Sequence, residues 1–201
     1  PEAAAVVDAY REDSRCEFKE YAGVGVAFQL VCALEGLTAE ELIGEFGDLV
    51  AIGTIADAVN LTGENRTLAK LGIEALNSTS RPGLKALIES SRAGGKPLDA
   101  VSVGFTIAPR INAAGRMGSA SRALELLMTE DTQAAEALAV EIDAENEARR
   151  KAESEILADI ASQFQENPHL KYDKIIIVYS TGWHAGVAGI VAARITESFG
   201  R

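Results

Sequence analysis

The segment from residue 108 to residue 117 combines two arginines, an asparagine and several small residues in ten positions. The guanidinium group of an arginine presents a planar fork of donors that matches the oxygens of a phosphate. Small neighbours let a phosphodiester approach the backbone. Arg110, Asn112 and Arg116 are therefore candidate ligands of a phosphate chain. The alternative is a surface loop in which the arginines have only a structural role.

The charge of the chain is distributed unevenly. The net charge is −11 at pH 7, which argues against non-specific binding of nucleic acid over the whole surface. Residues 81–122, however, contain seven Lys or Arg and two Asp or Glu, whereas residues 130–166 contain three basic and eleven acidic residues. A polyanion can still use the basic window around the two arginines.

Asp57 follows a nearly continuous apolar run at 49–56, which predicts a strand buried on both faces. Because ligands gather at the carboxyl ends of strands in α/β sheets, Asp57 is a candidate ligand of Mg²⁺ or Mn²⁺. No second cluster of carboxylates accompanies it, so most ligands of a two-metal site would have to lie elsewhere. The alternative is an aspartate that caps a helix or a turn.

His184 lies between a predicted strand at 174–179 and a predicted helix at 186–199. An imidazole at that position can contact an anion bound at the N-terminus of the helix. A capping or packing role is the alternative.

The other elements follow from hydrophobic periodicity, and alternating apolar residues predict a further strand at 101–107. A capping-box spacing at Thr38 and Glu41 predicts a helix that ends near Phe46. Residues 132–166 contain neither Gly nor Pro and predict one exposed helix, about 50 Å long, that connects two domains. Two helices with a bend are the alternative there. Further helices are predicted at 21–35, 65–77 and 84–92.

Length and composition suit one large domain or two small ones, since 47% of the 201 residues are hydrophobic. No apolar run approaches the 18 residues of a membrane span. We interpret Cys16 and Cys32 as buried thiols of a reducing compartment, which favours the cytoplasm. The chain starts at Pro1 without a secretory leader, and its last strand and helix cannot bury both of their faces. We therefore expect a fragment, or a chain that another copy completes.

Taken in order, these motifs resemble the single-strand-specific DNA exonuclease family of the DHH phosphoesterase superfamily. The resemblance covers essentially the whole chain and rests on the segments 22–28, 48–57, 63–66, 109–117, 123–127 and 183–194. It implies an α/β fold built from the C-terminal part of a DHH-type parallel-sheet domain at 1–130, a long connector helix at 131–168, and the first strand and helix of a DHH-associated domain at 169–201.

The resemblance also implies a role for each candidate residue. Asp57 matches an aspartate that binds the catalytic Mn²⁺ or Mg²⁺ ions, and Arg116 matches an arginine that contacts the DNA phosphate beside them. Arg110 and Asn112 share the motif of Arg116, and His184 joins them as a nucleic-acid-binding residue. The implied reaction is attack of metal-activated water on single-stranded DNA, which releases 5′-mononucleotides from the 5′ end during DNA repair and recombination. A single-stranded-DNA-binding protein is a further implied partner.

The chain departs from the family pattern in several places. The aspartate-rich motifs and the Asp-His-His motif of the superfamily are absent, as is the glycine- and histidine-rich end of the associated domain. Asn60 and Ala108 stand where the family usually has Pro and Gly. We expect the chain alone to be inactive and its parent protein to be a nuclease. The alternatives are a DHH phosphodiesterase for short oligonucleotides or cyclic dinucleotides, and a nucleic-acid-binding relative that has lost its metals.

Overall fold

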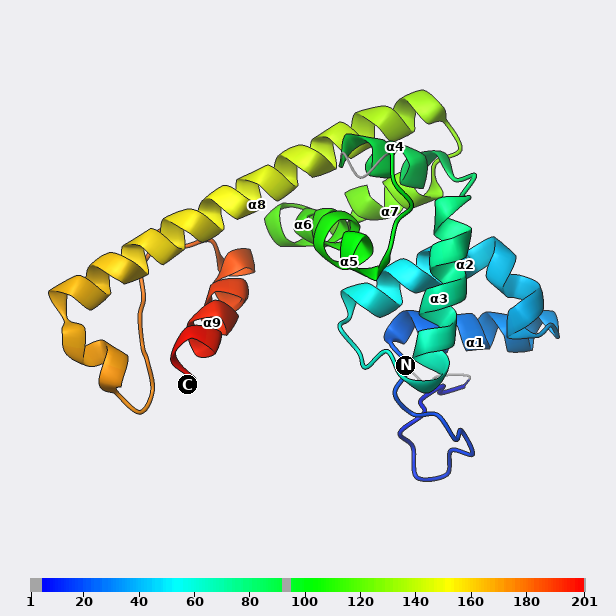
Figure 1. The fold of residues 1–201 in the computed structure, drawn as a ribbon, viewed down its shortest axis with the longest axis horizontal. Helices are drawn as coiled ribbons and strands as arrows, with labels where there is room; N and C mark the ends of the chain where they lie inside the picture. Colours follow the sequence, from blue (N-terminus) through cyan, green and yellow to red (C-terminus); the bar gives the residue numbers. More distant parts are fainter. Residues whose placement is uncertain (1–4, 92–94, 201) are drawn as a thin grey trace. The chain divides into compact units, whose positions relative to one another are not determined.

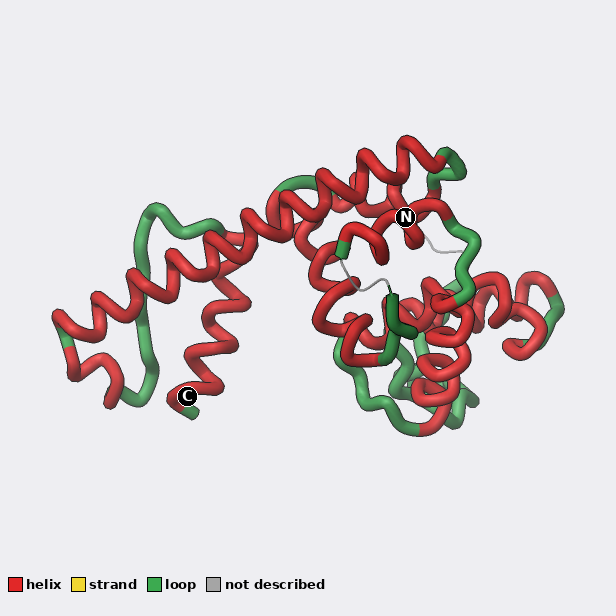
Figure 2. Tube along the Cα trace, turned by 45° about the horizontal axis from the view of Figure 1, so that its top comes forward, coloured by secondary structure: helices red, strands yellow, loops and turns green. Residues whose placement is uncertain are grey.

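The computed structural model describes residues 5–91 and 95–200, and its regular structure there consists of helices joined by loops (Figure 2). The chain divides into two compact units, one formed by Pro1–Pro109 with Leu126–Ala139 and the other by Arg110–Glu125 with Val140–Arg201. In chain order (Figure 1) the elements are α1 (Gly23–Glu35), α2 (Ala39–Ala56), α3 (Gly63–Asn77), α4 (Pro82–Ser90), α5 (Ala100–Ser102), the π-helix η1 (Val103–Ile107), α6 (Ala108–Met117), α7 (Ala120–Met128), α8 (Thr132–Glu166), the 3₁₀-helix η2 (Pro168–Tyr172) and α9 (Ala185–Phe199).

Helices α2 and α3 lie side by side in the first unit (Figure 1), and glycines let their backbones touch. A Cβ atom on Gly72 would lie 2.3 Å from the carbonyl oxygen of Gly47. Beside this contact, α1, α2 and α3 enclose an apolar cluster of Phe28, Cys32, Leu42, Val50 and Leu68. The glycines are therefore part of the packing.

The predicted strand at 49–56 is wrong, because these residues form the second half of α2. The capping box at Thr38 and Glu41 is present, but the helix that it starts continues past Phe46 to Ala56. The run is apolar because Val50, Ala51 and Ile52 are all buried against neighbouring helices. A short apolar run fits a buried helix as well as a buried strand, and periodicity alone cannot separate the two.

The predicted strand at 101–107 is also wrong, since these residues form α5 and η1. The side chain of Asp99 accepts a hydrogen bond from the backbone of Ser102 at 2.7 Å and starts the helical turn. Val103 and Ile107 are buried, whereas Val101 and Phe105 are exposed. A strand would place all four side chains on one face, and the helical backbone separates them.

The predicted helix at 132–166 is confirmed as the 35-residue α8, whose residues from Val140 onward belong to the second unit. Side chains from its C-terminal half meet side chains of α9 in an apolar cluster of Ile156, Ile160, Phe164, Val187 and Val191. The function of α8 as a connector between domains stays a prediction. So does the division at 1–130, 131–168 and 169–201.

The predicted strand at 174–179 keeps the alternation of a strand but forms no ladder among the described residues. Ile176 and Val178 pack against the core of the second unit, while Ile175 and Ile177 are 73% and 69% exposed. A strand is stabilised by hydrogen bonds to a neighbouring strand, and none is available within 5–91 and 95–200. The predicted α/β fold with a parallel sheet is therefore wrong for this structure, which is helical.

The remaining helix predictions hold with small changes at their ends. The predicted helices at 21–35, 65–77, 84–92 and 186–199 correspond to α1, α3, α4 and α9. Of the two cysteines, Cys32 is buried as expected, but Cys16 is exposed, and both are free thiols. Across the described residues, no helix combines the length and the apolar character that crossing a bilayer requires.

Candidate nucleic-acid interface

The segment that contains both arginines is helical, and this geometry divides its side chains between two faces. Asn112 and Arg116 are exposed and stand four residues apart on α6, so they share one face. Ala113 and Ala114 are fully buried on the opposite side. The exposed face therefore offers an amide and a guanidinium to a ligand.

Arg110 differs from Arg116 in its surroundings, since it is only 8% exposed. Its Nε lies 2.8 Å from Oδ1 of Asp143 on α8 and forms an ion pair with that carboxylate. This ion pair joins α6 to α8 within the second unit. The DNA contact expected of Arg110 stays a prediction, and its observed partner is Asp143.

His184 caps the N-terminus of α9 and is exposed. Its Nδ1 accepts a hydrogen bond from the backbone N–H of Gly186 at 3.2 Å. Because Nδ1 is the acceptor, the neutral ring carries its hydrogen on Nε2. The capping role considered for His184 is thus observed, and its Nε2–H remains a donor that a phosphate oxygen can accept.

Gly186 brings the last turn of α6 against the first turn of α9. The guanidinium Nη1 of Arg116 donates to the carbonyl of Gly186 at 3.3 Å. A Cβ atom on residue 186 would lie 2.2 Å from the backbone oxygen of Arg116, so only glycine permits this approach. Arg116 and His184, which are 68 positions apart in the sequence, therefore belong to one surface of the second unit.

The chemistry of this surface favours an anion. The N-terminus of a helix carries a partial positive charge, and the 15-residue α9 presents that end beside the Arg116 guanidinium. The contact with Gly186 uses one of the five N–H donors of arginine, which leaves others for phosphate oxygens. We refer to Arg116, His184 and the N-terminus of α9 as the Arg116–α9 surface.

Asp57 belongs to the first unit, where it is the exposed C-cap residue of α2. The prediction that it ends a strand is wrong, because the preceding residues are helical. The C-terminus of a helix carries a partial negative charge, so the C-cap position of Asp57 also favours a cation. Ala58, the next residue, has a left-handed φ of 55°, and the chain leaves the helix there.

One carboxylate does not form a two-metal site. Within 5–91 and 95–200, no group of three or more His, Cys, Asp or Glu side chains is placed to hold a metal ion. The residues present therefore do not fit two metal ions, and Asp57 can supply only one ligand. Asp57 and Arg116 lie in different compact units, so their predicted proximity stays a prediction.

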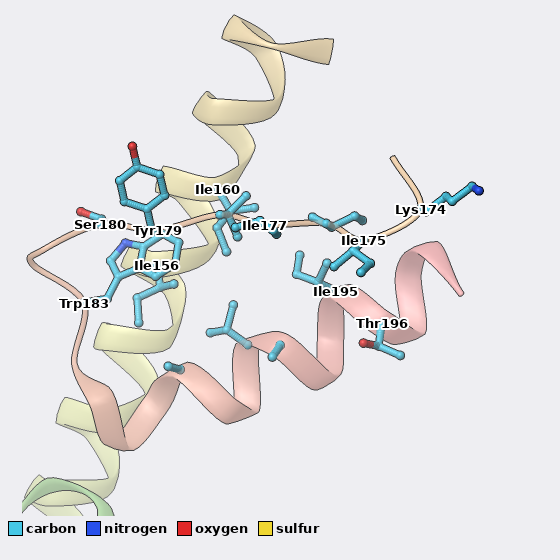
Figure 3. A pocket seen from close by; sticks show the side chains of 15 residues that line it. Ile156, Ile160, Lys174, Ile175, Ile177, Tyr179, Ser180, Trp183, Ile195 and Thr196 are labelled. Carbon is cyan, nitrogen blue, oxygen red and sulfur yellow. The ribbon is translucent and has the colours of Figure 1, made fainter. Parts of the chain in front are cut away.

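Two cavities of the second unit flank the segment that leads into α9. One, of about 690 Å³, is apolar and lies among Ile156, Ile160 and the side chains of 174–180 (Figure 3). The other, of about 420 Å³, includes His184 but also the exposed carboxylate of Glu155, which disfavours a phosphate. The exposed Arg116–α9 surface suits a phosphate better than either cavity.

Sequence reasoning missed the polar residues of α8 that hold this surface. Glu153 is 4% exposed and pairs with Arg149, and Asp159 accepts a hydrogen bond from Trp183. In the sequence these residues stand among many charged residues, which is typical of a solvated helix. The i, i+4 spacing of Arg149 and Glu153 was a local signal, but the burial of Glu153 depends on α9.

No protein-family model matches the chain. It is 44% identical over 201 residues to the single-stranded-DNA-specific exonuclease RecJ of Bacillus subtilis (strain 168), which is 100% of this chain and 25% of the relative. It is 42% identical over 176 residues to the protein of the same name from Thermus thermophilus, covering 88% of this chain and 25% of the relative.

Solved structures give the same result. The crystal structure of RecJ in complex with Mn²⁺ from Thermus thermophilus superposes with a TM-score of 0.78 at 40% identity, over 92% of this chain and 27% of that one. A crystal structure of exonuclease RecJ bound to manganese gives a TM-score of 0.79 at 40% identity, over 93% of this chain and 47% of that one. The chain thus spans about a quarter of the length of the two curated relatives named above.

Proposed function

Because the chain belongs to the RecJ family of single-stranded-DNA-specific exonucleases, we propose that it is a segment of an enzyme that hydrolyses single-stranded DNA with the help of Mn²⁺ or Mg²⁺. The observation that carries the proposal is 44% identity to a named exonuclease over the full chain. Metal dependence is supported by the related structures, which are complexes with Mn²⁺ or Mg²⁺.

In this proposal the Arg116–α9 surface binds a phosphate of the DNA backbone. Arg116 supplies a charged donor, His184 supplies Nε2–H, and Asn112 adds an amide on the same face of α6 as Arg116. Arg110 acts beside them mainly by fixing α6 to α8. Contacts of this kind bind DNA of any sequence, because they address the phosphate and not the bases.

The metal site of the proposed enzyme needs more ligands than residues 5–91 and 95–200 place together. Asp57 would contribute one carboxylate, and the other ligands would lie outside this described part. The bound ions would activate the attacking water. The family resemblance further supports a DHH phosphoesterase architecture with parts at 1–130, 131–168 and 169–201, and digestion from the 5′ end to 5′-mononucleotides.

The cellular setting is also part of the proposal. The family resemblance supports a role in DNA repair and recombination, in the cytoplasm, with a single-stranded-DNA-binding protein as a partner. The two free cysteines agree with a reducing compartment. A DHH phosphodiesterase for short oligonucleotides and a non-catalytic relative have less support, because the relatives that the chain matches are named exonucleases.

Hydrolysis by a full-length protein that contains this segment tests the proposal. With a labelled single strand and Mn²⁺, we expect mononucleotide release by the unchanged protein and a loss of orders of magnitude for Asp57→Ala. Binding of the same strand, measured with EDTA present, should survive Asp57→Ala. A protein that releases no mononucleotides, or an Asp57→Ala variant with unchanged turnover, would contradict the proposal.

A further inference from the structure

Two polar contacts tie α8 to the part of the chain that carries His184. The indole Nε1 of Trp183, the residue before His184, donates to Oδ2 of Asp159 at 2.7 Å. Ten residues after His184, Nε of Arg194 on α9 lies 2.7 Å from Oε1 of Glu153. Both contacts lie within the second unit. They contact the segment just before α9 and, at Arg194, the second half of the helix.

Glu153 is the more buried of the two carboxylates, with 4% of its surface exposed. Its Oε2 accepts a hydrogen bond from Nη1 of Arg149 at 2.8 Å, while Oε1 faces Arg194 as a charge contact. Arg149 also donates to the side-chain oxygen of the fully buried Asn146. A buried carboxylate must be paired to remain charged at low cost. Arg149 and Arg194 together supply the opposite charge, and the Arg194 contact links α9 to α8 while the Arg194 side chain stays 57% exposed.

The segment before His184 is held by Asp159 in the same way. Gln163 on α8 donates to the carbonyl of Tyr179 at 3.2 Å, three residues before Gly182. Figure 3 shows Trp183 beside Ile156 of α8, where its ring joins the apolar cluster. Asp159 therefore directs a partly buried indole whose backbone continues into the cap of α9.

These contacts lie next to the residues of the Arg116–α9 surface. The cap residue His184 directly follows Trp183, and Gly186 contacts the last turn of α6 at Arg116. A shift of α9 by even part of a helical turn would separate its positive end from the Arg116 guanidinium. Because the attraction of a phosphate to two positive groups depends on both being near it, the position of α9 controls affinity.

We propose that Asp159 and Glu153 are positioning residues for DNA binding: through Trp183 and Arg194 they hold α9 so that its N-terminus and His184 stay beside Arg116. The inference rests on the proposed function, since it assigns these carboxylates to the same surface. Neither carboxylate touches the DNA; both act through the residues that they hold.

The chain offers matched variants for the test. Asp159→Leu removes the acceptor of Trp183, whereas Asp159→Asn keeps an oxygen acceptor without the charge. Glu153→Gln removes the buried charge of α8, and Glu147→Gln removes the same charge from an exposed position of that helix, where Glu147 pairs with Arg150. Trp183 is the single tryptophan of the chain, so its emission reports on the Asp159 contact directly.

The measurement is binding of a fluorescent single-stranded oligonucleotide by anisotropy, with thermal unfolding recorded for each variant and Trp183 emission recorded for each variant that keeps Trp183. We expect Asp159→Leu to weaken binding by about tenfold, the scale of one charge-assisted hydrogen bond. Glu153→Gln, which removes the charge that faces Arg194, should weaken binding in the same direction. Asp159→Asn and Glu147→Gln should bind within about twofold of the unchanged chain, which is the scatter of a neutral surface substitution. Trp183→Phe should weaken binding as much as Asp159→Leu, and the double variant should show no further loss.

Separate results overturn the separate proposals. Unchanged affinity in Asp159→Leu, with a shifted Trp183 emission, would show that the contact is structural only and would refute the inference. An additive loss in the Asp159→Leu, Trp183→Phe double variant would refute it as well. If the unchanged chain and the full-length protein both fail to bind single-stranded DNA, the proposed function fails, and the inference fails with it.

Discussion

Arg110 and Arg116 come from one short motif but have opposite surroundings. Arg110 is 8% exposed and paired with Asp143, whereas Arg116 is exposed and donates to the Gly186 carbonyl. A buried, paired arginine contributes chiefly to stability, because its removal leaves the charge of its partner unpaired. An exposed arginine beside a helix N-terminus contributes chiefly to binding. The two residues therefore predict opposite mutational effects.

Arg116→Ala should weaken binding of single-stranded DNA by about ten- to a hundredfold, since a contact to a charged group is worth roughly 1.5–3 kcal/mol. Its free energy of unfolding should change little. Arg110→Ala should instead lower the free energy of unfolding by roughly 1–3 kcal/mol, because the Asp143 carboxylate loses its partner. Anisotropy and urea denaturation of the two variants measure these effects, and the opposite pattern would refute the assignment.

The elements of the first unit depend on local starts and on close backbone contacts. Thr38 and Glu41 form a capping box in which the Glu41 carboxylate accepts from the Thr38 backbone at 2.8 Å. Further along α2, Gly47 meets Gly72 of α3. The first feature sets where the helix begins, and the second sets how near its neighbour lies. Each predicts a separate stability effect.

Gly72→Ala should destabilise the chain by roughly 1–3 kcal/mol, the usual cost of overpacking a core. The added Cβ would lie 2.3 Å from the Gly47 carbonyl oxygen and 2.7 Å from the Ala51 Cβ, so α2 and α3 must separate. Gly44→Ala is the control, because its Cβ would meet nothing within 4 Å. Since Gly44 also lies inside α2, this change should stabilise by about 0.5–1 kcal/mol. If urea denaturation showed that both substitutions change the free energy of unfolding equally, the close packing of α2 on α3 at Gly72 would be contradicted.

The capping box also predicts a dependence of stability on pH. The hydrogen bond from the Thr38 backbone is the main cause that lowers the pKa of Glu41 from 4.5. A lowered pKa means that the charged form stabilises the folded state at pH values above 4.5, and that this stabilisation fades as the pH falls through the lowered pKa. The wild-type chain should therefore unfold at a higher temperature than Glu41→Gln at pH 7. The difference should shrink in acid, and an increase on acidification would contradict the sign.

At the scale of the whole molecule, the proposed DNA-binding surface lies on one unit and the single candidate metal ligand, Asp57, lies on the other. It spans a quarter of the curated Bacillus subtilis relative, and its described residues contain no cluster that could hold a metal ion. Binding and hydrolysis should therefore separate in this chain, because phosphate contacts need only the Arg116–α9 surface.

The 201-residue chain should bind single-stranded DNA and release no mononucleotides in the presence of Mn²⁺, since one carboxylate cannot hold two metal ions. Incubation with an end-labelled single strand, followed by electrophoresis, measures the release. Full-length protein is the positive control. Release that copurifies with the unchanged chain and disappears in Asp57→Ala would contradict the prediction.

What the sequence determined by itself was local. The capping box at Thr38 predicted the start of α2, and the absence of Gly and Pro predicted α8, because both effects act within one or two helical turns. The residue types and the order of the motifs, from the segment at 22–28 to the segment at 183–194, were enough to identify the family. Those motifs identify chemistry through side-chain types, which do not depend on the backbone being a strand or a helix.

The tertiary structure decided what depends on neighbours far along the chain. The apolar run at 49–56 fits a buried strand as well as a buried helix. In the structure these residues are helical and pack against α1 and α3. Arg110 and Arg116 are the same residue type in one motif. Only their partners in the fold, Asp143 and Gly186, assign Arg110 to stability and Arg116 to the proposed binding surface. Glu153 is charged and looks solvated in the sequence. In the fold it is buried and faces Arg194 of α9, 41 positions away, as well as Arg149 of its own helix, and a buried charge is stable only where the fold supplies the opposite one.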